Sequence, residues 1–136
     1  MIEKKILVVG QEASFSKTIT EHDVCEFAGI TGDFNSIHID EEKAKKSFAG
    51  TRIAHGLLVG GLISATIGTK LPGEGAVYLE QDLKFVRPTC IGDTCTATVT
   101  IVEIINTEKG IYKLDTVIKN QNNEEVIKGY AVVKYL

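Results

Sequence analysis

The sequence has no tryptophan, only two prolines and no run of basic residues. Hydrophobic residues make up 43% and charged residues 24%, which is typical of a folded globular protein and not of a disordered or low-complexity chain. The net charge is −3, with acids and bases interspersed, which argues against a nucleic-acid-binding surface. The 136 residues are enough for one hydrophobic core, so we expect a single domain that spans residues 1–136.

Paired cysteines are also missing. The three cysteines, Cys25, Cys90 and Cys95, are odd in number and form no Cys-x-x-Cys motif. Two of them lie where strands are expected, and a small buried thiol is ordinary there. The apolar run at residues 6–9 is too short for a signal peptide. We therefore expect reduced thiols and a cytoplasmic location.

Residues 53–69 contain no charged side chain. The segment is slightly short for a membrane span, and it carries four glycines and a histidine. A helix that is apolar on all sides is typical of the core of a globular domain. The segment therefore predicts a central buried helix from about His55 to about Thr69, and no membrane association.

Turn signals and apolar periodicity predict the other elements. A strand is expected at 13–19, followed by a helix that a Thr20–Asp23 capping box opens and that runs to about Ile30. Asp40 is the expected N-cap of a short charged helix that ends at Gly50.

The C-terminal half predicts a four-stranded antiparallel meander, with strands at 77–86, 94–104, 111–119 and 125–135. In the second strand Cys95, Ala97, Val99 and Ile101 alternate with threonines and should face the core. The central helix is the available cover for this apolar face. We expect an α+β fold in which the sheet wraps one long helix, preceded by a segment of loops and short helices.

The spacing of Asp33 and His38 raises a question of geometry. Five residues apart, their side chains would diverge by about 140° on a helix and would face opposite sides of a strand. Only a loop lets them converge. Gly32, Asn35 and Ser36 favour turns and predict an irregular segment at 30–40.

The segment FAGITGDFNSIHIDEEKAKKSFAGTRIAHGLLVGGLIS resembles the hydratase-2 signature of the MaoC-like, (R)-specific enoyl-CoA hydratases, which are hot-dog-fold proteins. The downstream LPGEGAVYLEQDLKFVRPTCIGD is similar to the strand that follows the central helix in that family. Ser36 departs from the family pattern, which usually has proline there; serine constrains φ less and should leave the loop looser. The positions that match are Phe27, Gly32, Asp33, Asn35, Ile37, His38, Ala44, His55 and Gly56.

The resemblance implies a reversible syn addition of water to trans-2-enoyl-CoA, with no metal and no cofactor beyond the coenzyme A of the substrate. Asp33 and His38 would activate the water, and the Gly56 N–H would hold the negative charge on the thioester oxygen. Ser64 falls where related hydratases have a serine near the active site, so it is an expected substrate-binding residue. The family also implies a homodimer, or a dimer of dimers, in which the partner lines part of the site.

Each candidate residue also has a structural interpretation. Asp-x-Asn sequences are often Asx turns that bond only their own backbone. We expect Asn35 to organise the loop and His55 to cap or pack at the helix start. A metal site from His22, His38 and Asp40 has no recognisable ligand spacing.

Three other functions remain open at this point. An acyl-CoA thioesterase on the same fold often has an acid on the central helix, and none is present at 56–69. A 3-hydroxyacyl-carrier-protein dehydratase would use the same chemistry. A non-catalytic acyl-thioester-binding module would not need the Asp33–His38 pair.

Overall fold

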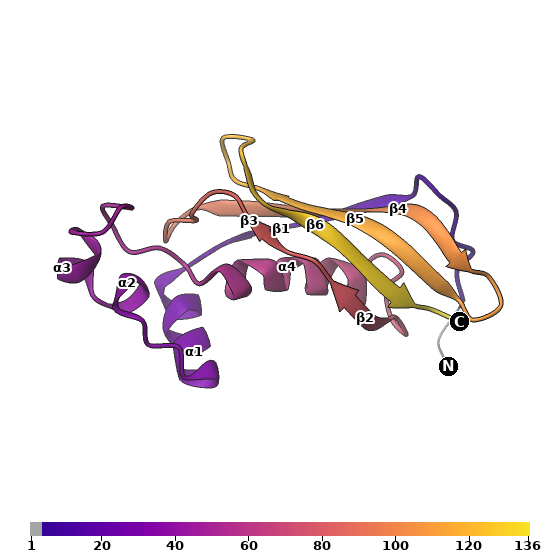
Figure 1. Ribbon diagram of the computed structural model, residues 1–136, viewed down its shortest axis with the longest axis horizontal. Coiled ribbons are helices and arrows are strands. Elements are labelled where there is room, and N and C mark those ends of the chain that lie inside the picture. The colour runs from indigo at the N-terminus through magenta and orange to yellow at the C-terminus, as the bar shows by residue number, and fades with distance from the viewer. Residues whose placement is uncertain (1–3) are drawn as a thin grey trace.

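The structure, a computed structural model, describes residues 4–136; residues 1–3 of the expected domain lie outside the described residues. A six-stranded antiparallel sheet covers one side of helix α4 (Gly56–Thr69) in the described part of the chain. Helices α1 (Glu21–Thr31), α2 (Ser36–Ile39) and α3 (Glu41–Ala44) gather at the N-terminal end of α4 (Figure 1). The expected hot-dog arrangement is confirmed.

The alternation in strand β4 (Thr94–Asn106) selects the buried face of the sheet. Its residues Cys95, Ala97, Val99 and Ile101 are fully buried, as the sequence pattern predicted. They belong to one core cluster with Val59, Ile63 and Ile67 of α4. Removal of these side chains from water is what holds the helix against the sheet.

The strand order corrects one expectation. Besides β4, the strands are β1 (Glu12–Thr18), β2 (Val77–Gln81), β3 (Lys84–Phe85), β5 (Ile111–Lys119) and β6 (Glu125–Lys134). Strands run in the order β1-β4-β5-β6-β2, so β4, β5 and β6 form the expected meander, whereas the expected strand at 77–86 lies beside β6 and not beside β4. That strand is also broken into two pieces, β2 and β3. Tight turns force neighbouring strands to pair, but the longer connection through Pro88 leaves the chain free to cross to the other side of the meander.

Helix α4 is not buried on all sides, which corrects a second expectation. The sheet covers one side of the helix, and a stripe on another side is exposed in this single chain. No helix within residues 4–136 is long and apolar enough to cross a membrane. The exposed stripe consists of Leu57, Gly61, Ser64 and Gly68.

The ends of α1 are fixed by local chemistry. The predicted capping box is present: Thr20 Oγ1 accepts from Asp23 N at 3.1 Å, and Asp23 Oδ2 accepts from Thr20 N at 2.9 Å. A hydrogen bond from Lys17, together with the bond from the Thr20 backbone, lowers the pKa of Asp23. At the other end Gly32 has φ 84, a left-handed conformation that glycine adopts easily and that turns the chain toward Asp33.

Candidate active site

The segment after α1 is more regular than expected, because it contains one helical turn. Asp33 Oδ1 accepts from Asn35 N at 3.2 Å, and Asn35 Oδ1 accepts from Ile37 N at 3.2 Å. Asn35 is thereby the N-cap of α2, and Ser36 is its first residue. Proline is favoured at the first position of a helix, so the family's proline would fit the same backbone. The Asx turn at Asp33 is present, but it uses only one of the two carboxylate oxygens in its bond to Asn35.

Hydrogen bonds join this turn to the chain that leads into α4. His38 Nδ1 lies 2.7 Å from Ile53 O, and His55 Nε2 lies 2.9 Å from Asp33 O. In addition, Ile53 N donates to Ile37 O at 3.2 Å. Two segments that are distant in the sequence are therefore fixed side by side.

Arg52 adds a further connection in the same place. Its Nε donates to His38 O at 2.7 Å and its Nη1 donates to Glu21 Oε1 at 2.6 Å, so one guanidinium links α1 to α2. The Arg52 side chain is 13% exposed, and the hydrogen bond to Glu21 raises the pKa of the guanidinium. Arg52 was not among the residues predicted for the site, since its contacts are made through the backbone of α2 and leave no sequence motif.

These contacts also set the tautomers of the two histidines. A carbonyl oxygen only accepts, so His38 Nδ1 and His55 Nε2 must carry protons. When His38 is neutral, its lone pair is on Nε2. The lone pair of neutral His55 is on Nδ1, which is buried and has no hydrogen-bond partner among residues 4–136.

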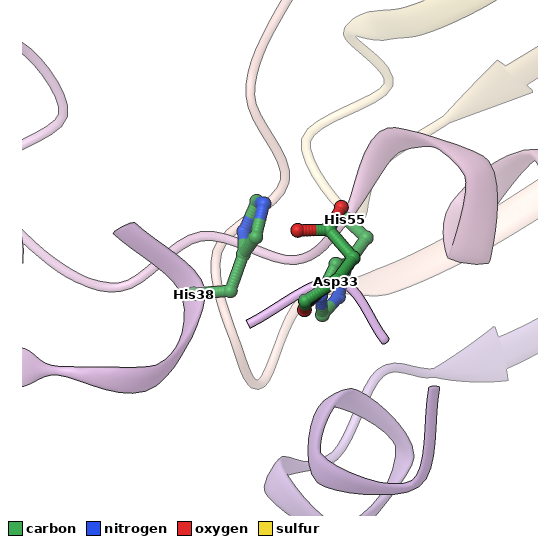
Figure 2. A group of neighbouring side chains, drawn as sticks. All are labelled: Asp33, His38 and His55. Atoms are coloured by element: carbon green, nitrogen blue, oxygen red, sulfur yellow. Dashed lines mark hydrogen bonds between the residues drawn. The ribbon is translucent and has the colours of Figure 1, made fainter. Parts of the chain in front are cut away.

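The loop brings Asp33, His38 and His55 together, with one ligand-type atom of each within 4.8 Å of the others. Figure 2 shows the three side chains gathered at this point. The His38 and His55 rings pack against each other, with centroids 4.0 Å apart and an interplanar angle of 31°. The Phe27 ring also packs against His55, with centroids 4.7 Å apart. His38 and His55 are buried, whereas Asp33 is exposed.

Within residues 4–136, the same three residues are also the group that could hold a metal ion. Ligands of one zinc ion lie about 3.4 Å apart, because Zn–N bonds are about 2.0–2.1 Å long. Here one ligand-type atom of each residue lies within 4.8 Å of the others, and the His38 and His55 rings are tilted by 31° to each other. The expected absence of a metal stays a prediction.

Gly56 is the first residue of α4, and it lies next to this cluster. The N-cap residue, His55, makes no side-chain bond to the helix end, and its Nε2 is bonded to Asp33 O. The N–H groups of the first turn point out of the helix without intrahelical partners and lie at the positive end of its dipole. This helix start is therefore suited to hold a developing negative charge.

A cavity of about 580 Å³ connects these parts. Asp33, His38 and Gly56 lie on its wall, together with Phe27, Phe85 and Ile127 as apolar lining. A cavity of this size with a few converging polar groups is typical of a small-molecule site.

Ser64 is the predicted substrate-binding residue that the structure does not bring to this cavity; the loop-organising Asn35 also lies outside the cavity wall. It is exposed on the open stripe of α4 and is not part of the cavity wall. Eight residues along a helix from Gly56 correspond to about 12 Å of rise and about 80° of rotation, which carries Ser64 away from the helix start. Phe85, in contrast, lines the cavity but was not predicted.

Comparison with known proteins identifies the family to which this site belongs. The model of the MaoC like domain matches residues 7–123, and the chain belongs to this family. It is 51% identical, over 100 residues, to the (R)-specific enoyl-CoA hydratase of Rhodospirillum rubrum. The match covers 74% of this chain and 69% of that protein. It is 44% identical, over 128 residues, to the 3-hydroxybutyryl-CoA dehydratase of Methylorubrum extorquens, with 94% of this chain and 80% of that protein covered.

A solved structure is similar over nearly its whole length. The (R)-hydratase from Aeromonas caviae involved in PHA biosynthesis superposes with a TM-score of 0.91 and 38% identity. The match covers 96% of this chain and 98% of that chain. The fold expected from the family resemblance is therefore shown.

Replacing Arg52 by methionine tests whether its two contacts hold the site together. Arg52→Met removes the donors to His38 O and Glu21, and a hydrogen bond to a charged group contributes about 1.5–3 kcal/mol. We expect the free energy of unfolding in urea to fall by about 2 kcal/mol. The control Lys45→Met removes an exposed pair with Glu42 and should change it by less than about 0.5 kcal/mol. Equal effects of the two variants would contradict this role of Arg52.

Proposed function

We propose that this chain is an (R)-specific enoyl-CoA hydratase, which reversibly adds water to a trans-2-enoyl-CoA. The observation that carries the proposal is the convergence of two proton acceptors, Asp33 and His38, at a cavity that also contains the start of α4. The relatives named as (R)-specific enoyl-CoA hydratase and 3-hydroxybutyryl-CoA dehydratase support a coenzyme A thioester as the substrate.

Asp33 and His38 are proposed to hold one water between them. Both offer a lone pair, the carboxylate of Asp33 and the Nε2 of neutral His38, so each can accept one hydrogen of the same water. Two acceptors bound in this way lie about 4.5 Å apart, since each is about 2.8 Å from the water oxygen. A carboxylate oxygen of Asp33 and a ring nitrogen of His38 lie within 4.8 Å of each other, which leaves room for such a bridge. Both lone pairs of the water oxygen are then unused, and one of them can attack C3.

Gly56 is proposed to supply the second requirement of the reaction. As the oxygen of water bonds to C3, the C2–C3 π electrons move toward the thioester and its oxygen becomes negative. The Gly56 N–H, at the start of α4, would donate a hydrogen bond to this oxygen. The proton taken from water by the Asp33–His38 pair then goes to C2 on the same face, and dehydration is the reverse.

Two of the three alternative functions lack support from this site. Helix α4 carries no Asp or Glu that could act in a thioesterase of the type with an acid on its central helix. A purely binding module would have no need for two acceptors at the spacing that bridges one water. A carrier-protein dehydratase would share the site. The relatives at 51% and 44% identity are named for coenzyme A substrates, which favours coenzyme A as the carrier of the acyl group.

The proposed reaction transfers only the elements of water, so it needs no cofactor beyond the coenzyme A of the substrate and no metal. The three cysteines, Cys25, Cys90 and Cys95, are free thiols, which supports the proposed cytoplasmic location.

We also propose that the chain forms a homodimer. Strand β2 is at the edge of the sheet and exposes Val77 and Leu79, and α4 exposes Leu57. A second copy would cover these apolar side chains, which water solvates poorly. Sedimentation at micromolar concentration should give twice the 14.8 kDa mass of one chain, and a monomer would reject the proposal.

The proposed chemistry predicts a specific result in a two-channel assay on crotonyl-CoA. One channel follows the loss of the enoyl-thioester absorbance and the other follows free thiol. We expect the enoyl signal to fall without thiol release, and Asp33→Asn to lower kcat by about 10²–10⁴-fold. Asparagine keeps an oxygen that can accept from Asn35 N, so the loop should be retained.

The matched control is Asp40→Asn, which makes the same chemical change at the N-cap of α3 and should leave kcat within about twofold. Thiol release by the wild-type protein would indicate a thioesterase instead. An Asp33→Asn variant as active as the wild type would remove Asp33 from the mechanism.

A further inference from the structure

Two glycines of α4 leave space that two side chains fill, Leu83 just before β3 and Phe85 in β3. A Cβ atom at Gly56 would lie 2.6 Å from Phe85 Cε1 and 2.7 Å from Cδ1. A Cβ at Gly60 would lie 3.3 Å from Leu83 Cδ1. Gly56 and Gly60 are one turn apart on one face of the helix, and Leu83 and Phe85 are two residues apart on one face of the extended chain. The same kind of contact, a side chain packed against a helix glycine, therefore occurs twice.

The Phe85 ring has a second property that Leu83 lacks. It lines the cavity that also contains Asp33 and His38, and 53% of Phe85 is exposed. An aromatic ring that lies against the Cα of Gly56, and that the core does not enclose, is free to contact a ligand bound at the Gly56 N–H.

We propose that Phe85 is a substrate-positioning residue, whose ring against Gly56 forms the wall that holds the thioester carbonyl at the Gly56 N–H. This inference rests on the proposed function. It also gives glycine at position 56 a second purpose. A Cβ there would displace the Phe85 ring, in addition to any restriction that it placed on the approach of the substrate.

The half-exposed state of Phe85 makes this distinction testable. Its ring can rotate toward solvent, so Gly56→Ala should leave the fold intact. Alanine also keeps the backbone N–H that is proposed to bind the oxyanion. A loss of activity in Gly56→Ala would then come either from the displaced ring or from obstruction of the substrate by the new Cβ. Misplacement of a bound substrate by about 1 Å can cost about 10²-fold in rate.

A double-mutant cycle on crotonyl-CoA hydration separates the two explanations. Gly56→Ala should lower kcat/KM by about 10²-fold in the wild-type background, but by less than about threefold in a Phe85→Ala background, where no ring remains to be displaced. In a Phe48→Ala background the full loss should persist, because Phe48 lines the cavity but the three atoms nearest to a Cβ at Gly56 all belong to Phe85. The same factor in all three backgrounds, including no loss in any, would overturn the inference.

A binding measurement tests the contact without catalysis. The sequence has no tryptophan, so Phe85→Trp creates a single fluorescent probe. Its emission should change when saturated butyryl-CoA, which cannot be hydrated, is added. Phe34→Trp is the control, since Phe34 is 63% exposed and lies outside the cavity wall, and its emission should not change.

The two measurements keep the inference and the proposed function separate. If the wild-type protein hydrates crotonyl-CoA while Phe85→Trp gives no response and the cycle shows no coupling, the role of Phe85 is rejected and the hydratase function stands. If Phe85→Trp responds to butyryl-CoA but the wild-type protein hydrates nothing, the contact is supported and the proposed reaction fails.

Discussion

The site depends on the hydrogen bonds that join residues 33–38 to residues 52–55. The bond of His38 Nδ1 to Ile53 O orients the ring and leaves its lone pair on Nε2, and the bond of His55 Nε2 to Asp33 O fixes the start of the loop. Arg52 holds the backbone of His38 from the outside. Without these contacts a four-residue helix such as α2 would not persist, because one turn alone does not offset the entropy of ordering it.

The rest of the fold holds residues 52–55 in place. Residues 52–55 lead directly into α4, which the inward face of β4 holds by apolar packing. Ala54 N also donates to Thr89 O at 2.7 Å, and Ile53 forms a bridge with Cys90, so the approach to the helix is attached to the chain that precedes β4. The loop thus takes its rigidity from the core, although Asp33 itself is exposed. In the proposed mechanism Asp33 exchanges protons with water, and that exposure suits this role.

Much of this could be predicted from local sequence, and the failures have physical causes. The capping box at Thr20, the helix start at Gly56 and the alternation from Cys95 to Ile101 are local patterns, and they are confirmed. The pairing of β2 with β6 depends on which partner competes best across the sheet, and no local pattern records that choice. For the same reason the link from Arg52 to the α2 backbone and the packing of Phe85 against Gly56 were not predicted, since each joins segments that are far apart in sequence. The convergence of Asp33 and His38 was expected, because their spacing excludes every regular structure that could hold them together.

In the proposed mechanism one acid–base pair on one face of the alkene delivers both parts of the water molecule. Hydration of crotonyl-CoA in D2O, with the configuration of C2 and C3 read by NMR, measures this directly. With Asp33 and His38 acting from a single side, the 3-hydroxy thioester should carry one deuterium at C2, on the face that received the hydroxyl group. Deuterium on the opposite face of C2, or distributed over both C2 positions, would contradict delivery by this pair.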